Sequence, residues 1–201
     1  MKFLPHWSAL AAISILLSGI TLATLVKLSN QRSVSTFGEV PDFSFVDQNG
    51  LPFTRSDLEG KIWIANFIFT KCAGNCPLMV TTMKLLAEGE LPSNVKMVSF
   101  TVDPRNDTPS ALHQYARLNL GNSDRWLLVT GEKDKIYRLS KEGFHLVVDD
   151  TRGTKLEPIT HSNRFTLIDR TGKIRSYYDG TLAESATRIL KDILYLVDEV
   201  D

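Results

Sequence analysis

The chain has 201 residues with 23 basic and 23 acidic side chains, so its formal net charge is zero. No basic surplus exists to neutralise phosphates, which excludes a dedicated nucleic-acid binder. With 43% hydrophobic residues and two cysteines, the chain is neither disordered nor a small protein held by several disulfides.

An uncharged run of 19 residues, Ser8–Val26, lies between Lys2 and Lys27. As a helix it would be about 28 Å long, close to the hydrocarbon thickness of a bilayer. A cleaved signal peptide is the alternative, but this apolar core is long for one and no A-x-A-like cleavage site follows. We therefore predict a transmembrane signal anchor over residues 1–28, a polar linker over residues 29–38 and one domain over residues 39–201.

The predicted location follows from this anchor. A single N-terminal span before a long domain most simply exports that domain, and residues 34–201 carry 20 basic and 23 acidic side chains, a net charge of −3. No Arg-rich transit segment precedes the apolar run, which favours a bacterium over a mitochondrion. We expect a single-pass protein of the bacterial cell membrane with its domain on the extracytoplasmic side.

The first half of the domain alternates strands and helices. Asn49 and Gly50 predict a hairpin turn within residues 42–53. Residues 61–69 are almost continuously apolar, which is typical of a strand covered on both faces. A helix is expected over residues 76–87, with Pro77 suited to its first turn, and a second buried strand over residues 95–103.

The second half continues the alternation. Asp107 or Thr108 can cap a helix over residues 109–120. Further expected elements are a strand over 125–131, a short helix over 132–143, a possible strand over 144–150, a hairpin over 163–180 that turns at 170–172, and an amphipathic helix over 182–197. This order predicts an α/β, thioredoxin-like fold.

Both cysteines, Cys72 and Cys76, lie where the first buried strand meets its helix. The partial positive charge of a helix N-terminus favours thiolates, the form that attacks disulfides and binds soft metals. Three intervening residues let both sulfurs face one point. The pair could instead form a structural disulfide that closes a small loop.

Two cysteines cannot complete a structural zinc site, which has four ligands. Two thiolates and one imidazole do suit copper in both its Cu(I) and Cu(II) states. Among the histidines, His6 precedes the anchor and His113 lies mid-helix. His161, in the segment that leads into the hairpin, is a better candidate ligand than His145, which can face solvent from a strand.

Three motifs in order carry a resemblance to a known family: FTKCAGNCPLM from Phe69, FTVDPRNDTP from Phe100 and THSNRFTLIDRTGKI from Thr160. With the predicted anchor, they resemble the Sco/SenC family of copper-binding assembly proteins. The resemblance implies a thioredoxin-like fold that holds one copper ion through Cys72, Cys76 and His161. It also implies a partner, the copper A subunit of cytochrome c oxidase, which such a protein matures by delivering copper or by reducing the subunit's cysteines.

The chain departs from the family pattern in the cysteine loop and just before the histidine. Ala73, Gly74 and Asn75 stand where the cysteine loop often carries Pro and Asp, and Thr160 stands where many members have Asp before the histidine. Asp103 and Asp107 match the second motif. They are candidates for supporting the ligands or contacting a partner, although Asp107 can equally cap a helix.

The residues leave a second function open. A thiol–disulfide oxidoreductase would use Cys72 and Cys76 as its catalytic pair, one to form a mixed disulfide with an exported client and one to resolve it. A thioredoxin-like protein would then be an expected reductant. The oxidoreductase needs both cysteines, whereas only the copper chaperone also needs His161.

Overall fold

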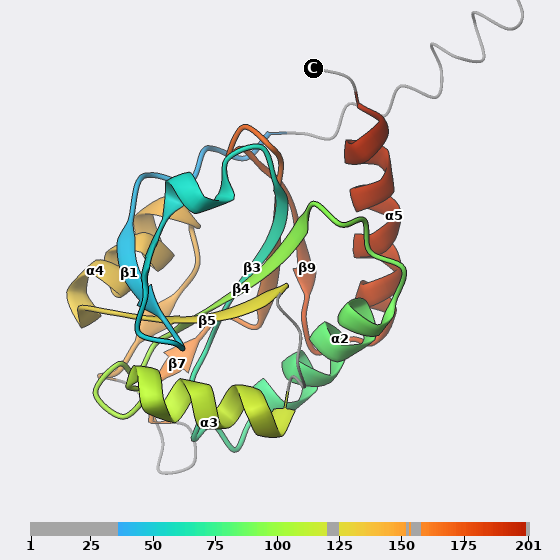
Figure 1. Ribbon diagram of the computed structural model, residues 1–201. Coiled ribbons are helices and arrows are strands. Elements are labelled where there is room, and N and C mark those ends of the chain that lie inside the picture. The colour runs from blue at the N-terminus through green and yellow to red at the C-terminus, as the bar shows by residue number, and fades with distance from the viewer. Residues whose placement is uncertain (1–35, 120–124, 152, 154–157, 200–201) are drawn as a thin grey trace, which may run out of the picture. The chain divides into compact units, whose positions relative to one another are not determined.

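A seven-stranded sheet organises the computed structural model, which describes residues 36–119, 125–151, 153 and 158–199 (Figure 1). The strands run in the order β2-β1-β5-β4-β3-β8-β9. Their bounds are β1 Ser44–Asp47, β2 Pro52–Thr54, β3 Ile62–Ile68, β4 Val95–Thr101, β5 Trp126–Thr130, β8 Arg164–Ile168 and β9 Ile174–Asp179.

Three parallel strands, β3, β4 and β5, form the middle of this sheet, and antiparallel strands flank them on both sides. A short antiparallel pair, β6 (Val148–Asp149) and β7 (Thr160–His161), forms a second sheet. Parallel strands end at the same edge, so the loops that follow β3 and β4 emerge side by side. Strand β8 is antiparallel to β3 and begins at that same edge.

Helices cover both faces of the sheet (Figure 1). Helices α2 (Cys76–Glu88), α3 (Pro109–Asn119) and α5 (Glu184–Asp198) lie on one side. On the other side lie α4 (Lys133–Arg138) and the π-helical turn η2 (Leu139–Gly143), and the 3₁₀ turn η1 (Arg55–Leu58) joins β2 to β3. The observed α/β order agrees with the sequence prediction.

The core explains why β3 is central. All seven of its residues are buried, as expected for a strand with helices on both faces. On the α4 side, Phe67 stacks on Phe100 with ring centroids 5.3 Å apart, and Phe144 packs edge-on against Phe67 and Trp63. Each fully buried ring contributes about 1.5–3 kcal/mol by burial, so this cluster holds the sheet on which the candidate site is built.

Both predicted hairpins are present. Gly50 and Gly172 have φ angles of 76° and 87° at the two turns, a conformation that glycine adopts without a steric cost. The predicted strand over residues 144–150 is shorter than expected and comprises only β6, because His145 has a φ angle of 54° and breaks the extended backbone. Strand β4 likewise ends at Thr101 rather than at residue 103.

The predicted anchor at residues 1–28 lies outside the described residues, as does most of the linker at residues 29–38. Within the part of the chain that the structure describes, no helix is long and apolar enough to cross a membrane.

Candidate metal centre

The two cysteines leave the sheet at the carboxyl end of β3. The backbone N–H of Cys72 donates to the carbonyl of Phe69 at 3.2 Å, which turns the chain back toward α2. Cys76 is the first residue of α2, and Pro77 follows it where a missing N–H costs nothing. Cys76 is only 1% exposed, whereas Cys72 is partly exposed.

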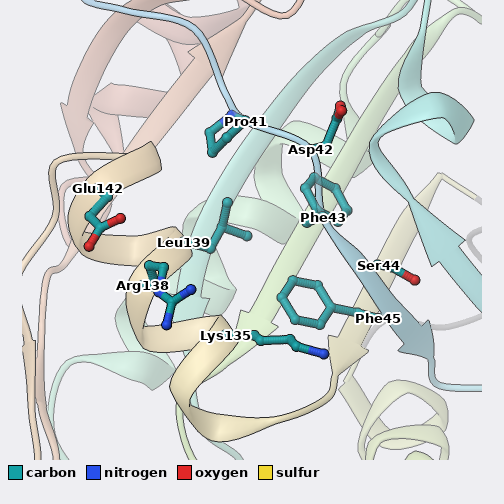
Figure 2. A pocket seen from close by; sticks show the side chains of 9 residues that line it. All are labelled: Pro41, Asp42, Phe43, Ser44, Phe45, Lys135, Arg138, Leu139 and Glu142. Atoms are coloured by element: carbon teal, nitrogen blue, oxygen red, sulfur yellow. The ribbon is translucent and has the colours of Figure 1, made fainter.

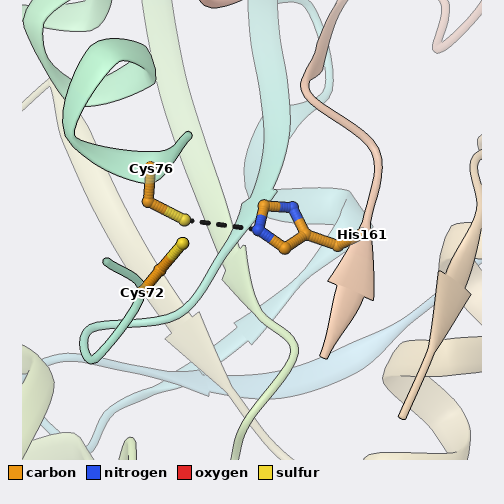
Figure 3. Close-up of side chains that lie close together, drawn as sticks. All are labelled: Cys72, Cys76 and His161. Atoms are coloured by element: carbon orange, nitrogen blue, oxygen red, sulfur yellow. Dashed lines mark hydrogen bonds between the residues drawn. The ribbon is translucent and has the colours of Figure 1, made fainter. Parts of the chain in front are cut away.

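The imidazole of His161 comes from β7 and faces the cysteine loop (Figure 3). Its Nε2 lies 3.3 Å from the Cys76 Sγ, and its Nδ1 lies 3.0 Å from the carbonyl oxygen of Ser162. A carbonyl can only accept, so Nδ1 carries a proton, and Nε2, which faces the sulfurs, is the ring nitrogen available to a metal ion. The ring of Phe69 packs edge-on against the imidazole at 5.6 Å and fixes its plane.

These three side chains form a compact donor set. The two Sγ atoms and a ring nitrogen all lie within 4.8 Å of one another. Two sulfurs and one imidazole nitrogen fit a soft ion such as Cu(I), and the partly exposed side leaves room for a further ligand on Cu(II). The spacing therefore predicted correctly that both sulfurs face one point, and the structure brings His161 to it.

The electrostatics favour thiolate at this point. A hydrogen bond from Cys76, opposed by burial and reinforced by a hydrogen bond from His161, lowers the pKa of Cys72 to about 4. The N-terminus of α2 adds its partial positive charge. At neutral pH the Cys72 sulfur is thus in the form that binds metals and attacks disulfides.

The other described histidines lie apart from the two sulfurs. His113 is exposed on α3, and its Nδ1 lies 3.3 Å from the Oδ1 of Asn49. His145 is exposed before β6 and lines a separate cavity of about 360 Å³ with Phe37 and Tyr177. His6 lies outside the described residues.

Comparison with known proteins decides the family. The SCO1/SenC family model matches residues 31–198 of the 201-residue chain. This chain belongs to the SCO1/SenC family. The SCO1 protein homolog of Bacillus subtilis (strain 168) is 32% identical over 161 residues, which cover 77% of this chain and 81% of that protein. A Stutzerimonas stutzeri protein named "Putative copper-binding protein" is 30% identical over 160 residues, covering 77% and 76% of the two chains.

Solved structures of SCO1/SenC proteins share the fold. A SCO1/SenC family lipoprotein from Bacillus anthracis str. Ames superposes with a TM-score of 0.73 at 33% identity, covering 80% of this chain and 96% of that one. BsSco, described with a disulfide switch as a member of the Sco family of cytochrome c oxidase assembly proteins, superposes with a TM-score of 0.72 at 28% identity, covering 83% and 98%. The predicted thioredoxin-like α/β fold is therefore confirmed.

The two acidic candidates of this SCO1/SenC chain have different surroundings. Asp103 accepts a hydrogen bond from the Asn106 amide at 2.7 Å within its own loop. Asp107 is completely buried, which excludes it from a docking surface. It does not cap α3 either, because Thr108 does so by accepting a bond from the Ala111 N–H at 3.3 Å.

Two residues near the candidate metal centre were not predicted from the sequence. Thr70 binds Asp107 across 37 positions of sequence, a contact for which a single sequence gives no signal. Tyr115 of α3 lies close enough that burial, together with the charges of Cys76 and Asp107, raises its pKa to about 12. In the sequence, a tyrosine within a predicted helix is as typical of a core residue as of a residue beside a metal centre.

A separate cavity of about 510 Å³ lies between β1 and α4 (Figure 2). Phe43, Phe45 and Leu139 form its apolar wall, and Lys135, Arg138 and Glu142 lie at its rim. It contains no cysteine or histidine, so the candidate chemistry of this SCO1/SenC protein remains at the cysteine loop.

Proposed function

We propose that this protein is a copper chaperone that holds one copper ion through Cys72, Cys76 and His161 and assists the maturation of the copper A centre of cytochrome c oxidase. The observation that carries the proposal is the convergence of two sulfurs and one imidazole nitrogen within 4.8 Å in a SCO1/SenC chain. The description of BsSco as an oxidase assembly protein supports the choice of partner.

Each donor has a distinct part in holding the copper. The Cys72 thiolate is in place at neutral pH, and Cys76 supplies a buried sulfur at the start of α2. His161 is oriented by the Ser162 carbonyl and contributes its Nε2 lone pair. An incoming ligand of a client reaches the partly exposed Cys72 before the buried Cys76, so exchange of the ion would begin on the Cys72 side.

Copper titration of the reduced full-length protein tests the proposal. We expect one ion per chain, with a thiolate-to-copper charge-transfer absorption on Cu(II) that disappears in Cys72→Ser and in Cys76→Ser. His113→Ala is the matched control, since His113 is exposed on α3 and contacts only Asn49 among the hydrogen bonds described. Stoichiometric binding that survives both cysteine substitutions would refute the proposal.

A second candidate function rests on the exposure and thiolate character of Cys72. An accessible thiolate beside a buried second thiol is also the arrangement of a thiol–disulfide oxidoreductase, which would reduce cysteines of an exported client. Insulin reduction distinguishes the two functions. A general reductase would act efficiently and retain its rate in His161→Ala, whereas a dedicated chaperone would act poorly on insulin.

We further propose that residues 1–28 anchor the protein in a bacterial membrane with the domain on the extracytoplasmic side. The support is the uncharged run Ser8–Val26. Membrane fractionation followed by protease treatment of intact spheroplasts tests it: the chain should remain with membranes after alkaline washing, and its domain should be digested. A chain released by the wash, or a protected domain, would contradict this topology.

A further inference from the structure

A buried carboxylate lies beneath the cysteine loop. Asp107 is 0% exposed, and no ion pair within the described part of the chain includes it. Burying a charged group without an opposite charge is costly unless hydrogen bonds replace the lost water. The partners of this carboxylate therefore indicate what it does.

Three hydrogen bonds converge on Asp107. The backbone N–H of Thr70 donates to Oδ2 at 3.1 Å, and the Thr70 hydroxyl donates to Oδ1 at 2.5 Å. The Thr101 hydroxyl donates to Oδ2 at 2.5 Å. One carboxylate thus joins the chain just after β3, the last residue of β4 and the segment that enters α3.

The Thr70 contact comes where the sheet stops supporting the cysteine loop. The link from the Val102 N–H to the Ile68 carbonyl at 2.8 Å lies at the end of the β3–β4 pairing. Thr70 follows two residues later, two residues before Cys72. The two hydrogen bonds from Thr70 to Asp107 therefore attach this segment where the sheet no longer does.

A carboxylate at position 107 matches its three donors. Its two oxygens offer about four acceptor sites, whereas an asparagine would keep an acceptor on one side only and would reverse the hydrogen bond to the Thr70 hydroxyl. Helix capping does not explain the residue, because Thr108 performs it. What remains is the attachment of the cysteine loop.

We propose that Asp107 is a positioning residue that acts through Thr70 to fix the Cys72 sulfur relative to Cys76 and His161. The proposal rests on the proposed copper site for its consequence in metal binding. Phe69 and the Ser162 carbonyl hold the imidazole, and the Thr70–Asp107 contact holds the thiolate opposite.

Hydroxyl removal and retention at one position provide the test. Thr70→Val keeps the shape of the side chain and removes its hydroxyl, whereas Thr70→Ser keeps the hydroxyl. Thr101→Val removes the bond from the β4 side, and Asp107→Asn removes the carboxylate. Thr166→Val is the matched control, because Thr166 is a fully buried threonine in β8 whose hydroxyl has no hydrogen-bond partner among the described residues.

Copper affinity is measured on the full-length protein by competition with a Cu(I) chelator, alongside thermal unfolding of the metal-free form. Groups that orient metal ligands from outside typically change affinity about 10–100-fold, so we expect Thr70→Val and Asp107→Asn to bind copper about tenfold more weakly. Thr70→Ser should stay within about threefold of the unsubstituted protein, and Thr166→Val should match it. If Asp107→Asn does not fold, the threonine variants decide.

A copper-free measurement separates this inference from the proposed function. The cysteine pair is equilibrated with glutathione, so that the dithiol loses two electrons and two protons as oxidised glutathione becomes two thiols. We expect the equilibrium constant to change at least about threefold in Thr70→Val and to be restored in Thr70→Ser, because thiol–disulfide equilibria depend on the geometry of the pair. An unsubstituted protein that binds no copper would overturn the proposed function only. A copper affinity and a glutathione equilibrium constant that are unchanged in Thr70→Val would overturn the positioning role of Asp107. Changes in Thr70→Ser as large as those in Thr70→Val would also overturn it.

Discussion

Replacing His161 by alanine separates metal binding from folding. The substitution removes one of three donor atoms that lie within 4.8 Å of one another and leaves both sulfurs in place. Outer groups that only orient ligands already change affinity about 10–100-fold, so loss of a ligand itself should weaken copper binding at least about 100-fold. That factor corresponds to about 2.7 kcal/mol of binding free energy.

The cost to folding should be smaller. The imidazole makes an edge contact with Phe69 and shares a hydrogen bond with the Cys76 sulfur. An aromatic pair contributes about 0.5–1.5 kcal/mol and a net hydrogen bond about 0.5–1.5 kcal/mol. Because His161 is only partly buried, we expect the free energy of unfolding to fall by about 1–2 kcal/mol, so the metal-free variant remains folded.

Two assays on one sample compare these quantities: competition with a chromophoric Cu(I) chelator and urea unfolding of the metal-free protein. His113→Ala is the matched histidine control and should leave copper affinity unchanged. A His161→Ala protein whose affinity stays within about threefold of the original would refute the ligand assignment, as would an equal loss in His113→Ala.

Three further predictions concern Cys72 and the ion pair between Asp169 and Arg175. Because the pKa of Cys72 is lowered to about 4, iodoacetamide should alkylate Cys72 of the metal-free protein at a nearly constant rate from pH 6 to pH 8. A rate that rises about tenfold per pH unit would indicate an ordinary thiol and contradict this. Arg175→Met should lower the free energy of unfolding in urea by about 3–5 kcal/mol, since it leaves the Asp169 carboxylate buried without its partner at 2.9 Å, and a loss below about 1 kcal/mol would contradict this. Burial raises the pKa of Asp169, but hydrogen bonds from Thr171 and Arg175 outweigh it and lower this pKa. The contribution of Asp169 to the free energy of unfolding should therefore be complete above the ordinary carboxyl pKa of about 4 and fade as the pH falls through the lower pKa of the folded state. Urea unfolding between pH 7 and pH 3 measures it, and Asp169→Asn should flatten that dependence.

Elements with strong local patterns could be predicted from the sequence. Strand β3 could be predicted because residues 61–69 are almost continuously apolar, and all seven residues of Ile62–Ile68 are indeed buried. Gly50 and Gly172 marked hairpins because their positive φ angles are specific to glycine-like turns. The strand expected over residues 144–150 is present only as β6, because its alternating apolar pattern did not reveal the left-handed backbone at His145.

In the candidate site, too, the local arrangement could be predicted from the sequence and the contacts between distant residues could not. The spacing of Cys72 and Cys76 at a strand–helix junction predicted a shared point for their sulfurs, because both residues are local to one loop. His161 was only preferred over His145 by its place before the hairpin, and the family resemblance assigned it as the ligand, since it is 85 positions from Cys76 and approaches through β7. Asp107 was interpretable as a helix cap, because nothing in a single sequence indicates that its carboxylate binds Thr70 instead.

X-ray absorption spectroscopy of the full-length protein loaded with Cu(I) identifies the atoms that bind the copper ion. We predict one copper ion per chain with two sulfur neighbours and one imidazole nitrogen, and with the nitrogen contribution lost in His161→Ala. A copper environment without sulfur, or copper that does not bind stoichiometrically, would contradict the assignment of Cys72, Cys76 and His161 as the metal centre.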